Sequence, residues 1–287
     1  MTNTEPIMNV TTLPLESSIS YVRVTPETAE RWLNSNQNNR RIHEAKIKQY
    51  AEDMRQGRWT HGADMICFGT DGTLLNGQHR LQAVVHSGCT VTFVVQRNTP
   101  SDAMPNIDSG IPRWSRDILR WNGEENVSTL SSATKLAMIY TDGRIYKSGS
   151  TWGTSNGAII AFIEANPELR RSVAVGQNVR RYVDCSAAVL AAAHWIIASV
   201  NNTETADHFF HQLAHKGGEA EGSAVLILDR RLRKVKAMQG RYSHREYLAL
   251  LIKGWNYYAT QTSAVKLNIV QRGQFSIPDV VRLKALD

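Results

Sequence analysis

Apolar and polar residues recur with two different periods along the first third of the chain, which predicts helices mixed with short strands. Thr25 and Pro26 are typical of a helix start, because threonine caps the first N–H groups and proline fits the first turn. The run 90–96 is rich in β-branched residues, which favours a strand. The expected elements are helices over 25–33, 43–57 and 78–87 and strands over 64–68, 73–75 and 90–96.

Beyond about residue 114 only helical periodicity is found. Helices are expected over 114–121, 128–141, 155–165, 186–199, 204–216, 223–238 and 244–260. The change of pattern falls in the stretch 98–112, which holds three of the eight prolines. We therefore expect an α+β protein with a loose tail over 1–18, a small α/β domain over 19–100, a linker loop over 101–112 and a mostly helical domain over 113–287.

The composition is that of an ordinary globular chain, with 42% hydrophobic and 21% charged residues and no apolar run long enough to cross a bilayer. The N-terminal residues lack the charged and apolar regions of a signal peptide. The three cysteines form no CxxC pair, so we expect a reduced, cytoplasmic protein with no membrane partner. A net charge of +7 favours nucleic acid or nucleotides as partners, unless the basic excess serves solubility alone.

The stretch DGTLLNGQHRLQAVVHSG, residues 71–88, places a glycine where an expected strand meets an expected helix. Gly77 would let backbone N–H groups approach an anion at the positive end of the helix dipole. Arg80 would bind a phosphate with two parallel hydrogen bonds, and His79 would donate a further bond or act as an acid–base group. The alternative is a sharp turn followed by solvated first-turn residues.

The segment LLNGQHRLQA resembles the arginine motif of the ParB/sulfiredoxin superfamily, and it is still more similar to the D-G-Q-H-R-L signature of the bacterial DGQHR domain. Upstream, Asn39-Arg40 and a helix ending in Met54-x-x-Gly57 resemble the segment that opens a ParB N-terminal domain. The similarity covers about residues 20–100, and the order of its motifs resembles that of uncharacterised ParB-like proteins of phages and actinobacteria.

The resemblance implies a nucleotide-binding domain in which Gly77 and Arg80 grip the phosphates and Arg40 is a second cationic contact. Asn76, Gln78 and His79 complete the expected phosphate site. The expected ligand is a nucleoside triphosphate, CTP or ATP, with Mg²⁺ as its companion in any phosphoryl chemistry. Within the superfamily such a domain serves DNA clamping, phosphoryl transfer or nuclease activity, so we expect a protein that acts on or near DNA.

Two departures from the family pattern bear on catalysis. Gln78 stands where ParB proteins have a glutamate and sulfiredoxins a cysteine, and Asn76 stands where the DGQHR signature has an aspartate. A neutral amide is neither a general base nor a good magnesium ligand, which favours binding over cleavage. The alternative is a nucleotide-dependent phosphotransferase, NTPase or nuclease that uses Asp108, with Arg113 beside it as another phosphate contact. Asp108 would otherwise begin a simple turn.

The helical half offers two further clusters. His208, His211 and His215 share one helix face, and their spacing is too long for one metal ion, so a polar helix face is expected rather than a metal site. A basic stretch at 229–241 predicts a stripe for nucleic-acid phosphates, unless its cations only complement a helix C-terminus. The stripe consists of Arg230, Arg233, Lys234 and Arg241. This half would supply homodimer contacts, nucleic-acid contacts or both.

Overall fold

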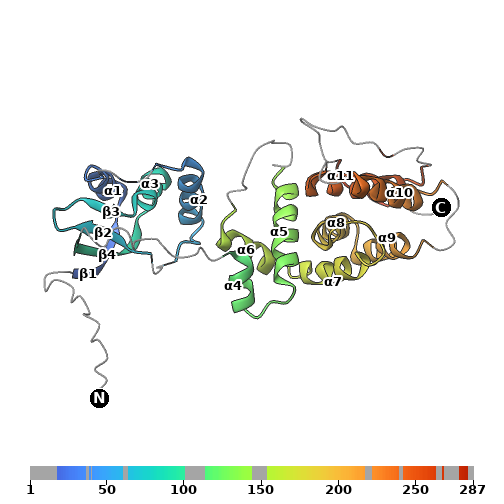
Figure 1. Cartoon of the computed structure of the whole chain (residues 1–287), viewed down its shortest axis with the longest axis horizontal. Coiled ribbons are helices and arrows are strands. Elements are labelled where there is room, and N and C mark those ends of the chain that lie inside the picture. Colours follow the sequence, from blue (N-terminus) through green and yellow to red (C-terminus); the bar gives the residue numbers. More distant parts are fainter. Residues whose placement is uncertain are drawn as a thin grey trace, which may run out of the picture. The chain divides into compact units, whose positions relative to one another are not determined.

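Two units of the chain, Met1–Pro112 and Arg113–Asp287, are each internally packed in the computed structural model, and each is described by itself (Figure 1). The fold is α+β, with a small mixed sheet and a mostly helical remainder, as the sequence predicts. The structure describes residues 18–36, 39, 41–60, 64–100, 114–143, 154–216, 222–238, 242–262, 267 and 278–283.

The first unit contains a four-stranded sheet in the order β1-β4-β2-β3. Its strands are β1 (Ser18–Val24), β2 (Ile66–Gly69), β3 (Leu74–Asn76) and β4 (Val91–Thr99). β1 runs antiparallel to β4, β4 runs parallel to β2, and β2 and β3 form an antiparallel pair. The turn between β2 and β3 is closed by Asp71, whose carboxylate accepts hydrogen bonds from the backbone and hydroxyl of Thr73.

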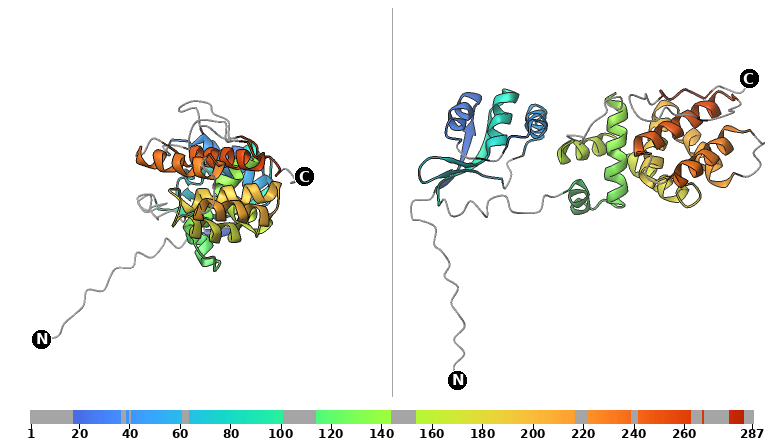
Figure 2. Two further views of the ribbon diagram at one scale, coloured as in Figure 1. Left: turned by 90° about the vertical axis from the view of Figure 1, so that its right-hand side faces the viewer. Right: turned by 45° about the horizontal axis from the view of Figure 1, so that its top comes forward.

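Three helices pack on one side of this sheet, as Figures 1 and 2 show. They are α1 (Pro26–Leu33), α2 (Glu44–Arg55) and α3 (Gln78–Ser87). The core between sheet and helices includes Ile66 and Val95 from the strands and Leu81 and Val84 from α3, all fully buried. The predicted helices and the three predicted strands of this unit are confirmed. β1 is a further strand, which the sequence pattern does not predict.

The described residues of the second unit form helices joined by loops and turns, without a strand. Its helices are α4 (Ser115–Trp121), α5 (Val127–Thr141), α6 (Asn156–Ala165), α7 (Leu169–Val179), α8 (Ala187–Val200), α9 (Thr203–His215), α10 (Ala224–Ala237) and α11 (His244–Ala259). α8 is buried along most of its length and packs against α5, α7, α9 and α11. All seven predicted helices are present, and α7 is one that the periodicity does not predict.

Candidate functional site

Gly77 forms the junction between β3 and α3. Its φ of +111° lies in a region that side chains with a Cβ atom rarely adopt, and a Cβ added there would lie 3.0 Å from Cγ1 of Ile66. The glycine is therefore required both by the backbone turn and by the close packing of this turn on β2. The predicted strand-to-helix turn is confirmed.

The three side chains that follow Gly77 are buried. Gln78, His79 and Arg80 are 4%, 8% and 6% exposed. The alternative in which His79 and Arg80 are solvated first-turn residues is therefore wrong. Polar groups in such positions need partners, because an unpaired buried donor or acceptor costs about 1–3 kcal/mol.

A loop before α2 supplies partners for the first turn of α3. Asn36 donates from Nδ2 to Oε1 of Gln78 at 3.2 Å, and the backbone N–H of His43 donates to Nε2 of His79 at 3.0 Å. Asn39 donates to the carbonyl oxygen of Leu74 at 2.6 Å. These bonds attach Asn36, Asn39 and His43 to the junction. An Nε2 that accepts a hydrogen bond carries no proton, so His79 holds its proton on Nδ1.

Arg80 is the most unusual group of the junction. Its Nη2 donates to the carbonyl oxygen of Met65 at 2.8 Å, and its Nη1 lies 3.6 Å from a carboxylate oxygen of Asp64. The Nε of Arg80 has no hydrogen-bond partner. The Asp64 side chain is 71% exposed, so its charge is largely screened by water. Among the described residues, no other carboxylate lies within ion-pair distance of this buried guanidinium.

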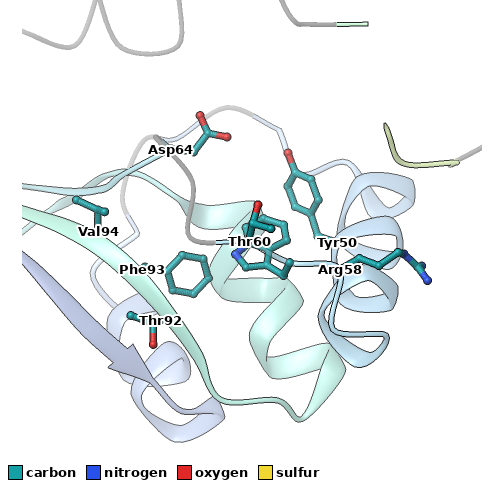
Figure 3. Close-up of a pocket in the computed structure, with 8 residues that line it drawn as sticks. Tyr50, Arg58, Thr60, Asp64, Thr92, Phe93 and Val94 are labelled. Atoms are coloured by element: carbon teal, nitrogen blue, oxygen red, sulfur yellow. The ribbon is translucent and has the colours of Figure 1, made fainter. Parts of the chain in front are cut away.

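Asp64 also borders a pocket of about 210 Å³ at the edge of the same unit (Figure 3). Trp59 makes edge-to-face contacts with Tyr50 and with Phe93, at centroid distances of 5.0 and 5.9 Å. The pocket is lined by Tyr50, Arg58, Trp59, Thr60, Asp64, Thr92, Phe93 and Val94. Nothing in the sequence motifs points to this pocket, because its residues come from segments that lack a shared pattern.

Of the other predicted site residues, only Asn76 is among the described residues of the first unit, and it directly precedes Gly77. Asn76 is the last residue of β3 and pairs with Cys67 of β2. Arg40, Asp108, Arg113 and Arg241 lie outside the described residues.

The basic stretch of α10 exposes its predicted cations Arg230, Arg233 and Lys234. Arg233 donates from Nε to the buried Asp229 at 2.9 Å, and Lys216 lies 2.8 Å from the other oxygen of the same carboxylate. Part of the positive charge on this helix is therefore already neutralised within the unit.

The three histidines of α9 are exposed and hydrogen-bond within their own helix. His208 contacts Gln212, and the Nδ1 of His215 contacts the carbonyl oxygen of His211. Across the described ranges, no group of three or more histidine, cysteine or acidic side chains is arranged to hold a metal ion.

A buried polar network in the second unit has no signal in the sequence. The hydroxyl of Ser172 lies 2.9 Å from Nδ1 of His194, whose Nε2 lies 2.9 Å from Asp207. Arg171 pairs with the same carboxylate. Burial lowers the pKa of His194 more than its bond to Asp207 raises it. Burial alone would raise the pKa of Asp207, but the bonds from Arg171 and His194 outweigh it, and the net shift is downward.

This network contains a serine, a histidine and an aspartate, yet its geometry does not suit a nucleophile. Ser172 and His194 are 2% and 1% exposed, so a substrate has no access to the hydroxyl. With Asp207 ionised, His194 donates from Nε2 and accepts at Nδ1 from Ser172. The network satisfies polar groups at the contact of α7, α8 and α9.

Comparison with models of protein families, with curated proteins and with solved structures finds no match for this chain. Among the helices of the described residues, none has the length and apolar character needed to cross a membrane.

Proposed function

We propose that this chain is a nucleotide-binding protein whose turn at 76–80 holds the phosphates of a nucleoside triphosphate, CTP or ATP. The observation that carries the proposal is the under-neutralised Arg80: a buried guanidinium with an unpartnered Nε and only one, largely solvated carboxylate near it. A buried cation is stable when it is paired, and the fork of an arginine matches a phosphate.

The position of Arg80 in the first turn of α3 adds to this argument. The N-terminus of a helix carries partial positive charge, and Gly77 keeps the junction free of a Cβ atom. Arg40 and Arg113 are proposed as further phosphate contacts. The resemblance of LLNGQHRLQA to the ParB/sulfiredoxin superfamily points to the same class of ligand.

Binding without cleavage is the favoured mode. Gln78 contributes an amide at the position next to the glycine, and that amide accepts a hydrogen bond from Asn36. An enzyme that uses Asp108 and Mg²⁺ is the alternative. Nucleotide turnover that is lost in Asp108→Ala and retained in Gln78→Ala would select it.

The proposal also places the protein in the cytoplasm, acting on or near DNA, with the helical unit contributing DNA contacts or a homodimer interface. The exposed Arg230 and Lys234 of α10 and the net charge of +7 support the DNA contact.

The test is calorimetric titration of the full chain with tripolyphosphate, CTP, ATP, GTP and the dNTPs, with and without Mg²⁺. We expect a nucleoside triphosphate to bind, and Arg80→Ala to weaken that binding roughly 10- to 100-fold, as the loss of a charged hydrogen-bond partner implies. Arg80→Lys keeps the positive charge but loses the planar guanidinium that forms two parallel hydrogen bonds with a phosphate, so it should also weaken binding.

Arg31→Ala is the matched control, because Arg31 is exposed on α1 and bonds only to Thr28 of its own helix. Thermal melting of each variant shows whether the fold is retained. The proposal fails if neither tripolyphosphate nor any nucleotide binds the wild-type chain, or if a folded Arg80→Lys and Arg80→Ala bind as the wild type does.

A further inference from the structure

We propose that the pocket beside Asp64 binds a planar nitrogen heterocycle that presents paired N–H donors, as guanine does. The proposal goes beyond phosphate binding and does not depend on it, because the lining groups it uses are aromatic rings, a hydroxyl and a carboxylate, and the lining Arg58 is engaged by Asp53. It rests on the shape of the pocket, on its aromatic lining and on the carboxylate at its edge.

The walls favour a flat ring. Trp59 stands nearly perpendicular to Tyr50 and to Phe93, at interplanar angles of 78° and 67°. Trp59 contacts both rings, so the three aromatic side chains form one continuous cluster that lines the pocket. Figure 3 shows Tyr50 and Phe93 among the lining residues, with Val94 beyond Phe93. Aromatic walls of this kind attract a π-system through dispersion and edge-to-face contacts.

Asp64 supplies the carboxylate at the edge of the pocket. Arg58 lines the pocket, but its Nε donates to Asp53 at 3.0 Å, and Figure 3 shows its guanidinium directed away from the other lining residues. Among the described residues, the only cation within ion-pair distance of Asp64 is Arg80, at 3.6 Å. An ionised carboxylate only accepts hydrogen bonds, so Asp64 selects a ligand that donates.

Two features narrow the ligand class further. A volume of about 210 Å³ suits one small ring system. The exposed Thr60 lines the pocket, and its hydroxyl can donate to a ring carbonyl. Adjacent N–H donors meet both oxygens of a carboxylate at once, and the N1–H and 2-amino groups of guanine have this arrangement beside a carbonyl.

Asp64 links the pocket to Arg80. Used together, the two sites would select GTP over the CTP or ATP that the resemblance implies, with the base at Asp64. Nucleosides, which carry no phosphate, test the pocket alone.

The experiment is calorimetric titration of the full chain with guanosine, inosine and cytidine. We expect guanosine to bind more tightly than inosine, which lacks the 2-amino group, and cytidine to bind weakest. Asp64→Asn should weaken guanosine binding roughly 10- to 100-fold and remove the difference between guanosine and inosine. Glu44→Gln, a neutralised exposed carboxylate on α2, should bind guanosine as the wild type does.

A second pair of variants tests the aromatic wall. Trp59→Leu should reduce guanosine binding, whereas Trp32→Leu, at the edge-to-face Trp32–Phe68 pair outside the pocket, should leave it unchanged. Thermal melting establishes that each variant is folded.

The proposal is overturned if guanosine does not bind the wild-type chain, or if it binds folded Asp64→Asn and wild type equally. Tripolyphosphate binding without guanosine binding would contradict the proposal for the pocket and leave the phosphate proposal intact. Guanosine binding without tripolyphosphate or nucleotide binding would contradict the phosphate proposal and leave the proposal for the pocket intact.

Discussion

His79 at the start of α3 and His43 just before α2 are joined by a hydrogen bond of 3.0 Å from the backbone N–H of His43 to Nε2 of His79. Their rings lie nearly parallel, with centroids 5.9 Å apart. A side chain in the first turn of α3 therefore holds the loop that leads into α2. In the same way Gln78 holds Asn36, so the two residues between Gly77 and Arg80 contact this loop.

Replacing His79 should detach that loop. His79→Ala leaves the His43 N–H without its acceptor, so we expect a loss of about 1–3 kcal/mol of unfolding free energy and faster hydrogen exchange at residues 34–43. His86→Ala, on an exposed position of the same helix, is the control and should change neither quantity. Unchanged exchange in His79→Ala would contradict the anchoring role.

Gly77 should tolerate a side chain less well than Gly88 at the other end of α3. Both have positive φ, so alanine costs roughly 1–2 kcal/mol at either position. At Gly77 the new Cβ also meets Ile66, whereas nothing lies within 4 Å of the Cβ position at Gly88. Urea unfolding should show the larger destabilisation for Gly77→Ala. Equal losses would mean that contact with Ile66 plays no part.

The buried His194 should make the stability of the helical unit depend on pH. Because burial lowers its pKa below the ordinary value of 6.5, the unfolded state takes up a proton before the folded state does. The stability is then fully present above pH 6.5 and falls as the pH drops below it, by at most about 1.4 kcal/mol per pH unit for one proton.

Urea unfolding of wild type, His194→Gln and His208→Gln between pH 8 and pH 5 measures this effect, over a range of about three pH units around the ordinary histidine value. His194→Gln should flatten the decline, and His208→Gln, at an exposed site on α9, should not. The same dependence of unfolding free energy on pH in all three proteins would contradict this role of His194. The lowered pKa of Asp207 acts in the same sense at lower pH, since its contribution is present above its ordinary value and lost below it.

Gly176 should be the most sensitive glycine of the helical unit. A Cβ there would lie 2.5 Å from the carbonyl oxygen of Ala187 and 2.9 Å from the backbone nitrogen of Ala191, so α7 and α8 would have to separate. We expect Gly176→Ala to cost roughly 1–3 kcal/mol despite the higher helix propensity of alanine. Gly254→Ala is the comparison, because the atoms nearest to its Cβ belong to the side chain of Leu228, at 2.6 to 3.1 Å, and a side chain can shift more easily than a backbone. A Gly176→Ala protein as stable as Gly254→Ala would refute this contact.

If α10 binds DNA, the binding should weaken steeply with salt. Arg230→Ala and Lys234→Ala should each lower the slope of log K against log salt by roughly 1, measured by fluorescence anisotropy on a short duplex. Arg116→Ala, at an exposed site on α4, should leave the slope unchanged. Binding that does not respond to salt would remove α10 from the proposed function.

Local signals were enough to predict the helices whose first and last residues are marked by capping residues in the sequence. The Thr25 hydroxyl accepts a hydrogen bond from the N–H of Thr28, and Pro26 opens α1, as a capping threonine and a first-turn proline predict. α3 lies between Gly77 and Gly88, both with positive φ. These features act within one or two turns, so neighbouring residues suffice to define them.

Two elements, α7 and β1, are not predicted from the sequence, because their stability comes from contacts with residues distant in the chain. The buried face of α7 includes Ser172 and Gly176, which carry no apolar signal, and these residues meet His194 and α8 only in the folded unit. β1 is mostly exposed, and its pairing with β4 joins segments far apart in the sequence.

The sequence by itself determined the α+β class, most of the elements and the importance of the turn at Gly77, because these depend on local periodicity and backbone conformation. Only the tertiary structure decided that Gln78, His79 and Arg80 are buried, since the partners of Gln78 and His79 lie 42 and 36 residues away and that of Arg80 lies 15 residues away. It also decided that Asp64 stands between Arg80 and an aromatic pocket. Burial and electrostatic pairing arise from long-range packing, which no single stretch of the chain specifies.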